Sequence, residues 1–352
     1  TSIGYFPVLI RDAFRTSSEA RPLEKVKRWT IMLGFMPMFI LLQLIHWFSF
    51  FLDALFFPGY RQVKVRRPMF VLGPPRSGTT HLHRVLADDR EQFTTLISWE
   101  LFLAPNIIQK KLIRLITVID LKLGKPLFRL ISFLERRVLQ VADAMHPSAL
   151  QAPEEDYFLM CMTLTCSGLA LVFPRSGRFW RYAFFDSTIS AATKQRAMTF
   201  YRIYLQKHLY TAGADKILLS KNASFNPWLE SLYHEFPDAS FIVCARDPVK
   251  TVPSMLSVAN AARVSFGGSA SNSEFEKNMI ALMKHHYQTL LNILPKIPAE
   301  RTMIVPNKRL HLQLRSTILD AYQHFGLSVN KLFSEKLNEL DRESRRFKSA
   351  HQ

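Results

Sequence analysis

The sequence has few cysteines: Cys161, Cys166 and Cys244 are the only three among 352 residues. Three thiols cannot build the disulfide framework of a small secreted domain, and their scarcity favours a reducing compartment. The sequence has no Cys and His spacing of the kind that forms a zinc site, so we expect no metal cofactor.

Acidic residues are also scarce. The chain carries 28 Asp and Glu residues against 46 Lys and Arg residues, which gives a net charge of +18. Such an excess implies an anionic partner, whether nucleic acid, an acidic membrane surface or a multiply charged small substrate. The sequence contains no recognised nucleic-acid-binding module, so we expect no nucleic-acid partner.

Charged residues are absent from positions 29–52, a stretch of 24 residues. At about 1.5 Å per helical residue, this stretch is long enough to cross a bilayer. Basic residues on both flanks conflict with a simple span, and Pro37 interrupts the segment. Three interpretations stay open: a helix or re-entrant hairpin in one membrane interface, a true span, and a buried pair of soluble helices. We expect residues 1–65 to form a helical, membrane-associating region.

A second stretch, residues 107–139, places apolar residues at helical spacing among many lysines and arginines. The sequence Gly124-Lys125-Pro126 predicts a break into two helices. These helices either rest on anionic lipid headgroups or pack on the core with a solvated basic face.

A glycine frame without the usual lysine follows the apolar residues 69–72, which predict a buried strand. Gly73 and Gly78 are separated by four residues and followed by two threonines, which is the spacing of a phosphate-binding loop. A P-loop NTPase would have Lys at the position of Thr79, whereas this loop carries Arg76 inside it. The frame therefore predicts an anion site but argues against a site for a β/γ-phosphate pair.

The loop offers several groups that hold oxyanions. Glycine lets successive backbone N–H groups converge on one point, and the following helix adds its positive N-terminal end. The hydroxyl groups of Ser77, Thr79 and Thr80 can donate hydrogen bonds, and Arg76 supplies a fixed positive fork. We expect the ligand to be bound by Arg76, Ser77, Gly78, Thr79 and Thr80.

Short apolar runs alternate with helical segments along the rest of the chain. The sequence predicts further strands at residues 216–220, 240–245 and 302–305, and helices at 195–210, 226–235, 251–262 and 275–292. This alternation predicts an α/β fold resembling that of P-loop proteins, with three layers and a mostly parallel central sheet flanked by helices. Ligands in such sheets bind at the carboxyl ends of the strands.

A second motif follows the strand predicted at residues 240–245. Arg246 stands directly after that strand, in the sequence Arg-Asp-Pro, and Ser254 lies on the next predicted helix. Both side chains can reach one phosphate group. Seen alone, Arg-Asp-Pro would indicate only a surface turn.

The Pro-Arg-Ser-Gly-Thr-Thr loop, combined with Arg-Asp-Pro and the serine beyond it, resembles the PAPS-dependent sulfotransferases, where PAPS is 3′-phosphoadenosine 5′-phosphosulfate. Arg in the first loop is similar to the tyrosylprotein and bacterial-type branch. The resemblance covers about residues 66–330. It implies that the first loop holds the 5′-phosphosulfate, and that Arg246 and Ser254 hold the 3′-phosphate.

The resemblance also implies catalytic residues. Lys221 follows a predicted strand. In relatives, a lysine at such a position reaches the bridging oxygen or the sulfate. Lys221 would therefore stabilise the developing negative charge together with Arg76. A general base should take the proton of the acceptor hydroxyl. Glu100 lies close to where relatives carry a catalytic glutamate. The other candidate bases are His146, Glu154 and Glu155.

These observations predict an enzyme that transfers the sulfuryl group from PAPS to a hydroxyl group by in-line displacement. Its catalytic domain would span residues 66–352, with a helical acceptor-site insertion at about 101–200. The hydrophobic segment suggests an amphipathic, lipid-linked or glycan acceptor and a cytoplasmic catalytic domain at a membrane, with a Golgi-type lumenal placement as the alternative. Two other functions stay open: a P-loop nucleotide kinase or NTPase, and a non-enzymatic basic protein on a membrane surface.

Overall fold

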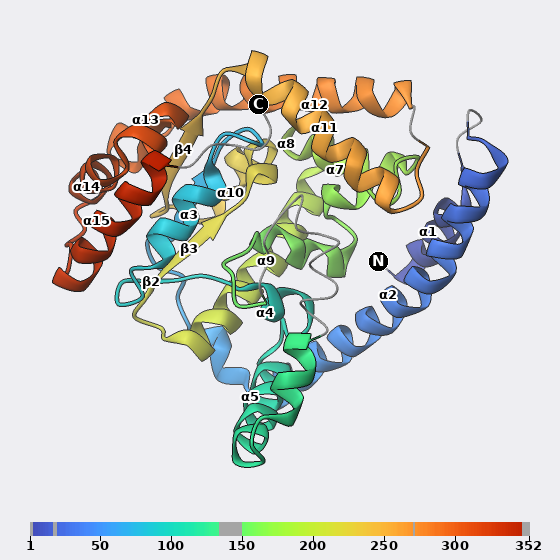
Figure 1. The fold of residues 1–352 in the computed structure, drawn as a ribbon, viewed down its shortest axis with the longest axis horizontal. Helices are drawn as coiled ribbons and strands as arrows, with labels where there is room; N and C mark the ends of the chain where they lie inside the picture. The colour runs from blue at the N-terminus through green and yellow to red at the C-terminus, as the bar shows by residue number, and fades with distance from the viewer. Residues whose placement is uncertain (1–2, 17–19, 134–149, 270–271, 347–352) are drawn as a thin grey trace.

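The chain folds around a five-stranded sheet with helices on both faces (Figure 1). The computed structural model describes residues 3–16, 20–133, 150–269 and 272–346. The strands are β1 (Met69–Leu72), β2 (Phe93–Thr94), β3 (Ile217–Lys221), β4 (Ser240–Ala245) and β5 (Thr302–Pro306). Their order is β2-β3-β1-β4-β5, and each neighbouring pair is parallel. The predicted α/β fold with a parallel central sheet is therefore confirmed.

The central strand, β1, sends its side chains into two separate cores. Phe70 and Leu72 belong to one buried apolar cluster, and Met69 and Val71 belong to another. Successive residues of a strand point to opposite faces, so a strand without polar residues fits where helices cover both faces. The composition of residues 69–72 thus follows from the position of β1 in the middle layer.

Helices supply the other side of each core. α3 (Thr79–Ala87), α13 (Asn307–Leu312), α14 (Leu314–His324) and α15 (Lys331–Arg346) pack around Met69 and Val71. α9 (Ala191–Ala212) and α10 (Leu229–Glu235) contribute to the core around Phe70 and Leu72. Further helices are α1 (Phe6–Phe14), α4 (Ser98–Phe102), α7 (Gly177–Ala183), α8 (Phe185–Thr188), α11 (Pro248–Ser265) and α12 (Ser273–Ile293).

The predicted strands lie within one residue of the observed ones at each end, because each is a short apolar run. β2 escaped prediction, since two residues carry no measurable period. The predicted helices correspond to α9, α10, α11 and α12, except that residues 223–228 form a 3-10 helix ahead of α10.

The uncharged segment belongs to a single helix, α2 (Pro22–Phe56), which is 35 residues long. Pro37 lies inside this helix; its ring removes one backbone donor, but the helix continues on both sides. The re-entrant hairpin and the pair of soluble helices are therefore wrong interpretations of this segment. Within the described residues, α2 is the one helix that is long and apolar enough to cross a membrane by length and composition.

The second basic stretch begins with α5 (Ile107–Lys122), and a further helical segment covers residues 126–133. The predicted break is confirmed: the backbone has a positive φ of 84° at Gly124 and 65° at Lys125. Both carboxylate oxygens of Asp120 accept hydrogen bonds from backbone N–H groups that begin the second segment. Residues 107–133, called the α5 hairpin below, project from the body of the molecule (Figure 1). The rest of the predicted stretch, 134–139, lies outside the described residues.

Candidate active site

The carboxyl ends of four strands meet at one edge of the sheet, and the residues at these ends include three that the sequence analysis singled out (Gly73, Lys221 and Arg246). Gly73 follows β1, Lys221 ends β3, Arg246 follows β4 and Asn307 follows β5. The parallel register sets Lys221 beside Val71, one residue before the end of β1. This edge is where ligands bind in parallel sheets.

The loop after β1 requires glycine at both ends. The φ angle is 150° at Gly73 and 100° at Gly78. A Cβ atom on Gly73 would lie 2.5 Å from a backbone oxygen of β4, and one on Gly78 would lie 2.7 Å from Nδ2 of Asn307. Asn226 Oδ1 accepts a hydrogen bond from the Gly73 N–H at 3.0 Å, and Asn307 Nδ2 donates to the Ser77 carbonyl oxygen at 2.9 Å. The loop is thus held in a fixed shape by side chains from the segments that follow β3 and β5.

Arg76 and Ser254 are hydrogen-bonded although 178 residues separate them: Arg76 Nε donates to Ser254 Oγ at 3.2 Å. Arg246 Nη1 donates to the carbonyl oxygen of Arg76 at 2.9 Å. The two motifs that the sequence analysis singled out therefore form one site.

The two arginines of this site, Arg76 and Arg246, have no carboxylate partner among the described residues. Burial lowers the pKa of the Arg76 guanidinium, and the like charge of Arg246 lowers that pKa further. In the described part of the chain, neither arginine forms a salt bridge. Two adjacent guanidinium groups without a carboxylate attract an anion with several oxygens.

The start of α3 has the features of a phosphate site. Ser77 Oγ is buried and lacks a hydrogen-bond partner within the described residues, whereas buried hydroxyl groups normally have one. Gly78 is the N-cap residue of α3 and provides no side-chain cap. Thr79 is buried and Thr80 half-buried in the first turn. The free amide groups, the hydroxyl groups and the helix end suit phosphate oxygens.

Lys221 lies against a carboxylate at the end of β3. Its Nζ atom is 2.8 Å from Oε1 of Glu155, and the side-chain exposures are 2% and 24%. The pair thus joins a buried cation to a carboxylate that is partly open to solvent. Glu155 was one of the open candidates for the base, and this contact pairs it with Lys221.

A second polar cluster lies directly behind this pair. Tyr201 Oη donates to Asp156 Oδ2 at 2.6 Å, and Ser220 Oγ donates to Asp156 Oδ1 at 2.9 Å. Burial raises the pKa of Asp156 to about 7, although the two hydrogen bonds act in the opposite direction. Because Asp156 follows Glu155 and Ser220 precedes Lys221, these bonds hold the two chain segments in register.

Glu100 has a different environment. Its Oε2 atom lies 3.2 Å from Lys110 Nζ and 3.4 Å from His208 Nδ1, and all three side chains are buried. Burial alone would raise the pKa of Glu100, but His208 and Lys110 outweigh it and lower the pKa to about 2. A carboxylate with such a low pKa has little tendency to take a proton. Lys110, one of the basic residues of the stretch 107–139, is buried in this cluster.

The remaining candidate bases are Glu154 and His146. Glu154 Oε1 accepts a hydrogen bond from the backbone N–H of Glu155 at 3.0 Å, so it supports the turn that carries Glu155. His146 lies outside the described residues.

Sequence reasoning missed several residues of this site. Asn226 and Asn307 hold the phosphate-binding loop, and Tyr287 Oη donates to the Arg246 carbonyl oxygen at 2.8 Å. Asn307 lies two residues beyond the strand predicted at residues 302–305, so the rule that singled out Arg246 could have found it. Asn226 and Tyr287 lie inside helical segments and carry no comparable signal. In the described part of the chain, no group of three or more His, Cys, Asp or Glu side chains could hold a metal.

Comparison with known proteins agrees with this arrangement. The model of the family described as the sulfotransferase family matches residues 68–331, a range that contains both anion-binding motifs and Lys221. The chain belongs to the sulfotransferase family. Sulfotransferases generally use PAPS as the sulfuryl donor.

Solved structures of two mycobacterial sulfotransferases have the same fold. STF9 from Mycobacterium avium matches with a TM-score of 0.75 and 18% identity, over 100% of this sulfotransferase and 86% of that chain. STF1 from Mycobacterium tuberculosis H37Rv matches with a TM-score of 0.69 and 21% identity, over 96% of this chain and 87% of that chain. A search of curated proteins finds no match.

Proposed function

We propose that this sulfotransferase transfers the sulfuryl group of PAPS to a hydroxyl group of an amphipathic, lipid-linked or glycan acceptor. The observation that carries the proposal is the juxtaposition of two sites. An anion site with two unbalanced arginines lies at the ends of β1 and β4, and the Lys221–Glu155 pair lies at the end of the neighbouring strand β3.

The donor would be held at two points. The backbone N–H groups from Gly78 to Thr80, with the Ser77 hydroxyl that lacks a partner within the described residues, would bind the phosphosulfate end. Arg246 and Ser254 would bind the 3′-phosphate, and Arg76 lies between the two points because it contacts both of these residues. This arrangement accounts for the absence of an NTPase-type lysine after Gly78, because Arg76 and Arg246 would supply the positive charge instead.

The acceptor proton would go to Glu155. This carboxylate is partly exposed, and its ion pair with Lys221 fixes its position. When bound, PAPS supplies the sulfuryl group and a phosphate that can leave. Lys221 and Arg76 stabilise the negative charge that develops as the bond to sulfur breaks, so the work of the protein is positioning and charge stabilisation.

We prefer Glu155 to Glu100 for this role, which revises the expectation from sequence. Glu100 has the separation from the loop that relatives suggest, but its carboxylate is enclosed by Lys110 and His208. A general base must lie within hydrogen-bonding reach of the proton that it takes, and a buried, doubly paired carboxylate does not meet this condition.

The donor site can be tested by calorimetric titration with adenosine 3′,5′-bisphosphate, the nucleotide product. Arg246→Ala should weaken binding by about 10- to 100-fold, since a hydrogen bond to a charged group contributes about 1.5–3 kcal/mol. Arg342→Ala removes an exposed arginine of α15 and serves as the matched control, with unchanged affinity.

Two results would contradict the proposed donor. Equal affinity of the two variants would mean that Arg246 does not hold the 3′-phosphate. Tight binding of ATP together with no binding of adenosine 3′,5′-bisphosphate would favour the nucleotide kinase alternative.

A further inference from the structure

Helix α2 turns many of its polar side chains toward the protein body and exposes large apolar ones. The side chains that it buries include Arg28, Gln43, His46, Ser49 and Asp53, which are all polar or charged. They recur at helical spacing and therefore share one face. A helix of a soluble domain normally buries its apolar face and exposes its polar one. Met32 and Met36 of α2 do join the protein core, but the body does not cover the apolar side chains on the opposite face of the helix.

The opposite face of α2 is apolar and open. Its large side chains are 58% to 65% exposed at Leu33, Leu41, Leu44, Phe48, Phe51 and Leu55. No Asp, Glu, Lys or Arg interrupts residues 29–52, and Asp53 is completely buried. These six residues define what we call the outer face of α2. A contiguous apolar surface of this extent marks a site of interaction with a protein or a membrane.

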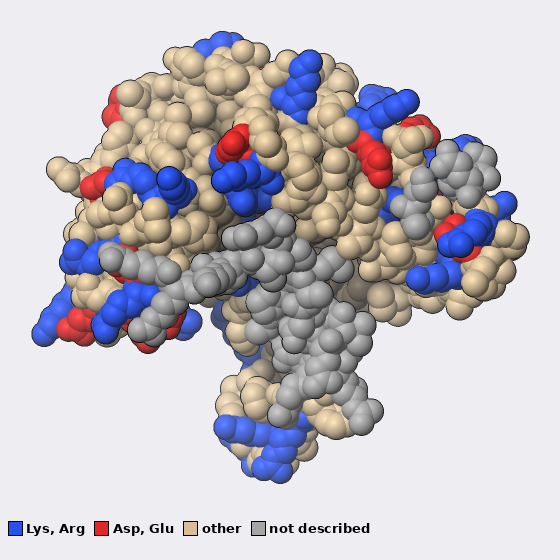
Figure 2. Space-filling view, turned by 45° about the horizontal axis from the view of Figure 1, so that its top comes forward, with Lys and Arg blue, Asp and Glu red and all other residues tan. Residues whose placement is uncertain are grey.

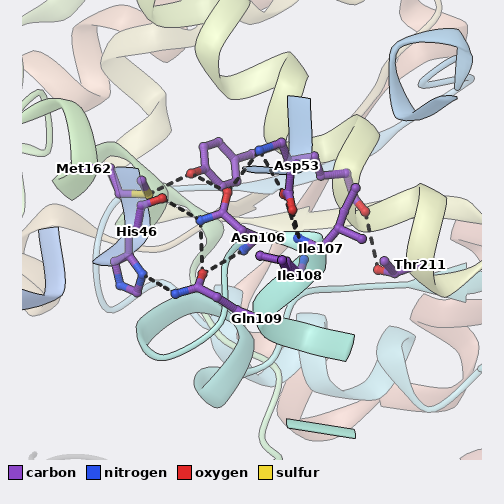
Figure 3. Close-up of polar contacts among 10 residues, drawn as sticks. His46, Asp53, Asn106, Ile107, Ile108, Gln109, Met162 and Thr211 are labelled. Atoms are coloured by element: carbon purple, nitrogen blue, oxygen red, sulfur yellow. Dashed lines mark hydrogen bonds and ion pairs between the residues drawn. The ribbon is translucent and has the colours of Figure 1, made fainter. Parts of the chain in front are cut away.

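Buried polar contacts fasten the inner face of α2 to the catalytic body. Asp53 Oδ2 lies 3.0 Å from Lys207 Nζ on α9 and accepts the Ile107 N–H at 2.8 Å at the start of α5. His46 accepts from Asn106 through its carbonyl oxygen and contacts Gln109 through Nδ1. Figure 3 shows these side chains pointing toward one another from α2 and the start of α5. A helix held along its length in this way cannot leave the body to cross a bilayer.

The α5 hairpin extends the same surface and adds cations. Lys111, Arg114, Lys122, Lys125 and Arg129 are exposed on it. Its one acidic residue, Asp120, is buried and caps the second helical segment. In Figure 2 the hairpin projects at the bottom and ends in basic side chains with no acidic side chain among them.

Exposed apolar side chains lie between these cations. They include Leu112, Leu115, Val118, Leu123, Phe128 and Leu130, which are 50% to 70% exposed. Apolar side chains interspersed with lysine and arginine alone are typical of elements that rest in the headgroup region of an anionic membrane.

We propose that the outer face of α2 and the α5 hairpin together form a docking surface for an anionic lipid bilayer, with α2 lying in the plane of the interface. Lys111 Nζ lies 5.0 Å from the ring of Phe57, just beyond the end of α2, so the two parts of the surface adjoin. A second copy of this chain fits the surface less well, because it would bring the hairpin's cations against like charges. The proposal goes beyond sulfuryl transfer and does not depend on it.

Co-sedimentation with vesicles of phosphatidylcholine and phosphatidylglycerol (3:1) tests the surface without any substrate. The full chain should bind, and the triple variant Leu44→Glu, Phe48→Glu, Phe51→Glu should bind at least 10-fold less. Ile280→Glu, Leu291→Glu, Leu332→Glu is the matched control: it adds the same charge at exposed apolar positions of α12 and α15 and should bind as wild type. Circular dichroism checks that each variant is folded.

A charge variant separates the contribution of the hairpin. Lys111→Gln, Arg114→Gln, Lys122→Gln should bind the anionic vesicles more weakly than wild type, and the binding that remains should come from the outer face of α2. Failure of the wild type to sediment with vesicles, or equal binding of the outer-face and control variants, overturns the proposal. So does light scattering that shows a dimer which the outer-face variant dissociates, together with no vesicle binding.

The orientation of α2 can be measured with spin labels at Leu33→Cys and Phe51→Cys, in a chain with Cys161→Ser because the other two cysteines are buried. These positions lie on the same side of the helix, five turns and about 27 Å apart along its axis. An in-plane helix places both labels at the same depth in vesicles. Depths that differ by most of this length would show a span and overturn the in-plane arrangement.

Discussion

Lys221 Nζ lies 2.8 Å from Glu155 Oε1, across 66 residues of chain, at the carboxyl end of β3. The contact sets a buried cation beside a partly exposed carboxylate, next to the strand that carries the phosphate-binding loop. The proposed proton acceptor and the proposed stabiliser of negative charge are thus in direct contact, and the chemistry proposed for this sulfotransferase depends on both.

Replacing Glu155 by Gln should lower kcat by about 10²- to 10⁴-fold, the usual contribution of a general base. The affinity for adenosine 3′,5′-bisphosphate should stay within a few-fold of wild type, because Glu155 does not hold the donor in our proposal. Steady-state kinetics and calorimetry measure the two effects. Glu154→Gln, the neighbouring carboxylate, is the control and should retain most of the activity; a Glu155→Gln enzyme with normal kcat would exclude this base.

Replacing Glu100 by Gln should reduce stability rather than catalysis. The substitution leaves Lys110 buried without its carboxylate, and removing one partner of a buried ion pair costs about 3–5 kcal/mol. Urea unfolding measures this cost. Activity per folded molecule should change little; a loss of kcat comparable to that of Glu155→Gln would restore Glu100 as the candidate base.

Replacing Arg76 by Lys should weaken donor binding, although the charge is kept. Arg76 contacts Ser254 through Nε and keeps further guanidinium donors for a ligand, and a lysine cannot supply this planar set of donors. We expect about a 10-fold loss of affinity for adenosine 3′,5′-bisphosphate. Ser254→Ala should cause a smaller loss. If Arg76→Lys binds as wild type, the arginine acts only as a point charge.

Asp156 should make stability depend on pH. Burial raises its pKa to about 7, above the value of 3.8 for an unperturbed side chain, so the native state binds a proton more tightly than the unfolded chain. The stability from this group is complete below pH 3.8 and is lost as pH rises through 7. Between pH 5 and 7 the wild type should lose about 2–3 kcal/mol relative to Asp156→Asn. Urea unfolding at both pH values tests this, and parallel behaviour of the two proteins would refute it.

The Asp53–Lys207 pair should behave as a unit. Asp53→Ala alone leaves Lys207 charged and unpaired in the interior and should cost about 3–5 kcal/mol of unfolding free energy. The double variant Asp53→Ala, Lys207→Met removes the stranded charge and should be more stable than the single variant. A double-mutant cycle in urea measures the coupling; additive effects would mean that the pair does not hold α2 to the body.

Much of the fold could be predicted because its signals are local. The apolar runs of β1, β3, β4 and β5 are visible without any tertiary information, and the glycine spacing from Gly73 to Gly78 indicates its turn directly. The division at residue 65 and the role of His146 stay predictions.

Local sequence signals could not identify the candidate general base. Glu100 and Glu155 are both glutamates near the start of a helical segment, and nothing in their neighbours along the chain separates them. Their difference comes from distant residues: Lys110 and His208 enclose one carboxylate, and Lys221 contacts the other.

By itself, the sequence determined that this protein has a parallel α/β sheet, a tight loop with glycine at both ends after β1 and a long helix with an uncharged segment before it. These features depend on residue type and spacing over a few turns or strand lengths. Only the tertiary structure decided that Arg76 is hydrogen-bonded to Ser254. The same holds for the ion pair of Glu155 with Lys221 and for the polar face that α2 turns toward the body. Each of these depends on contacts between residues far apart in the chain, which local pattern cannot specify.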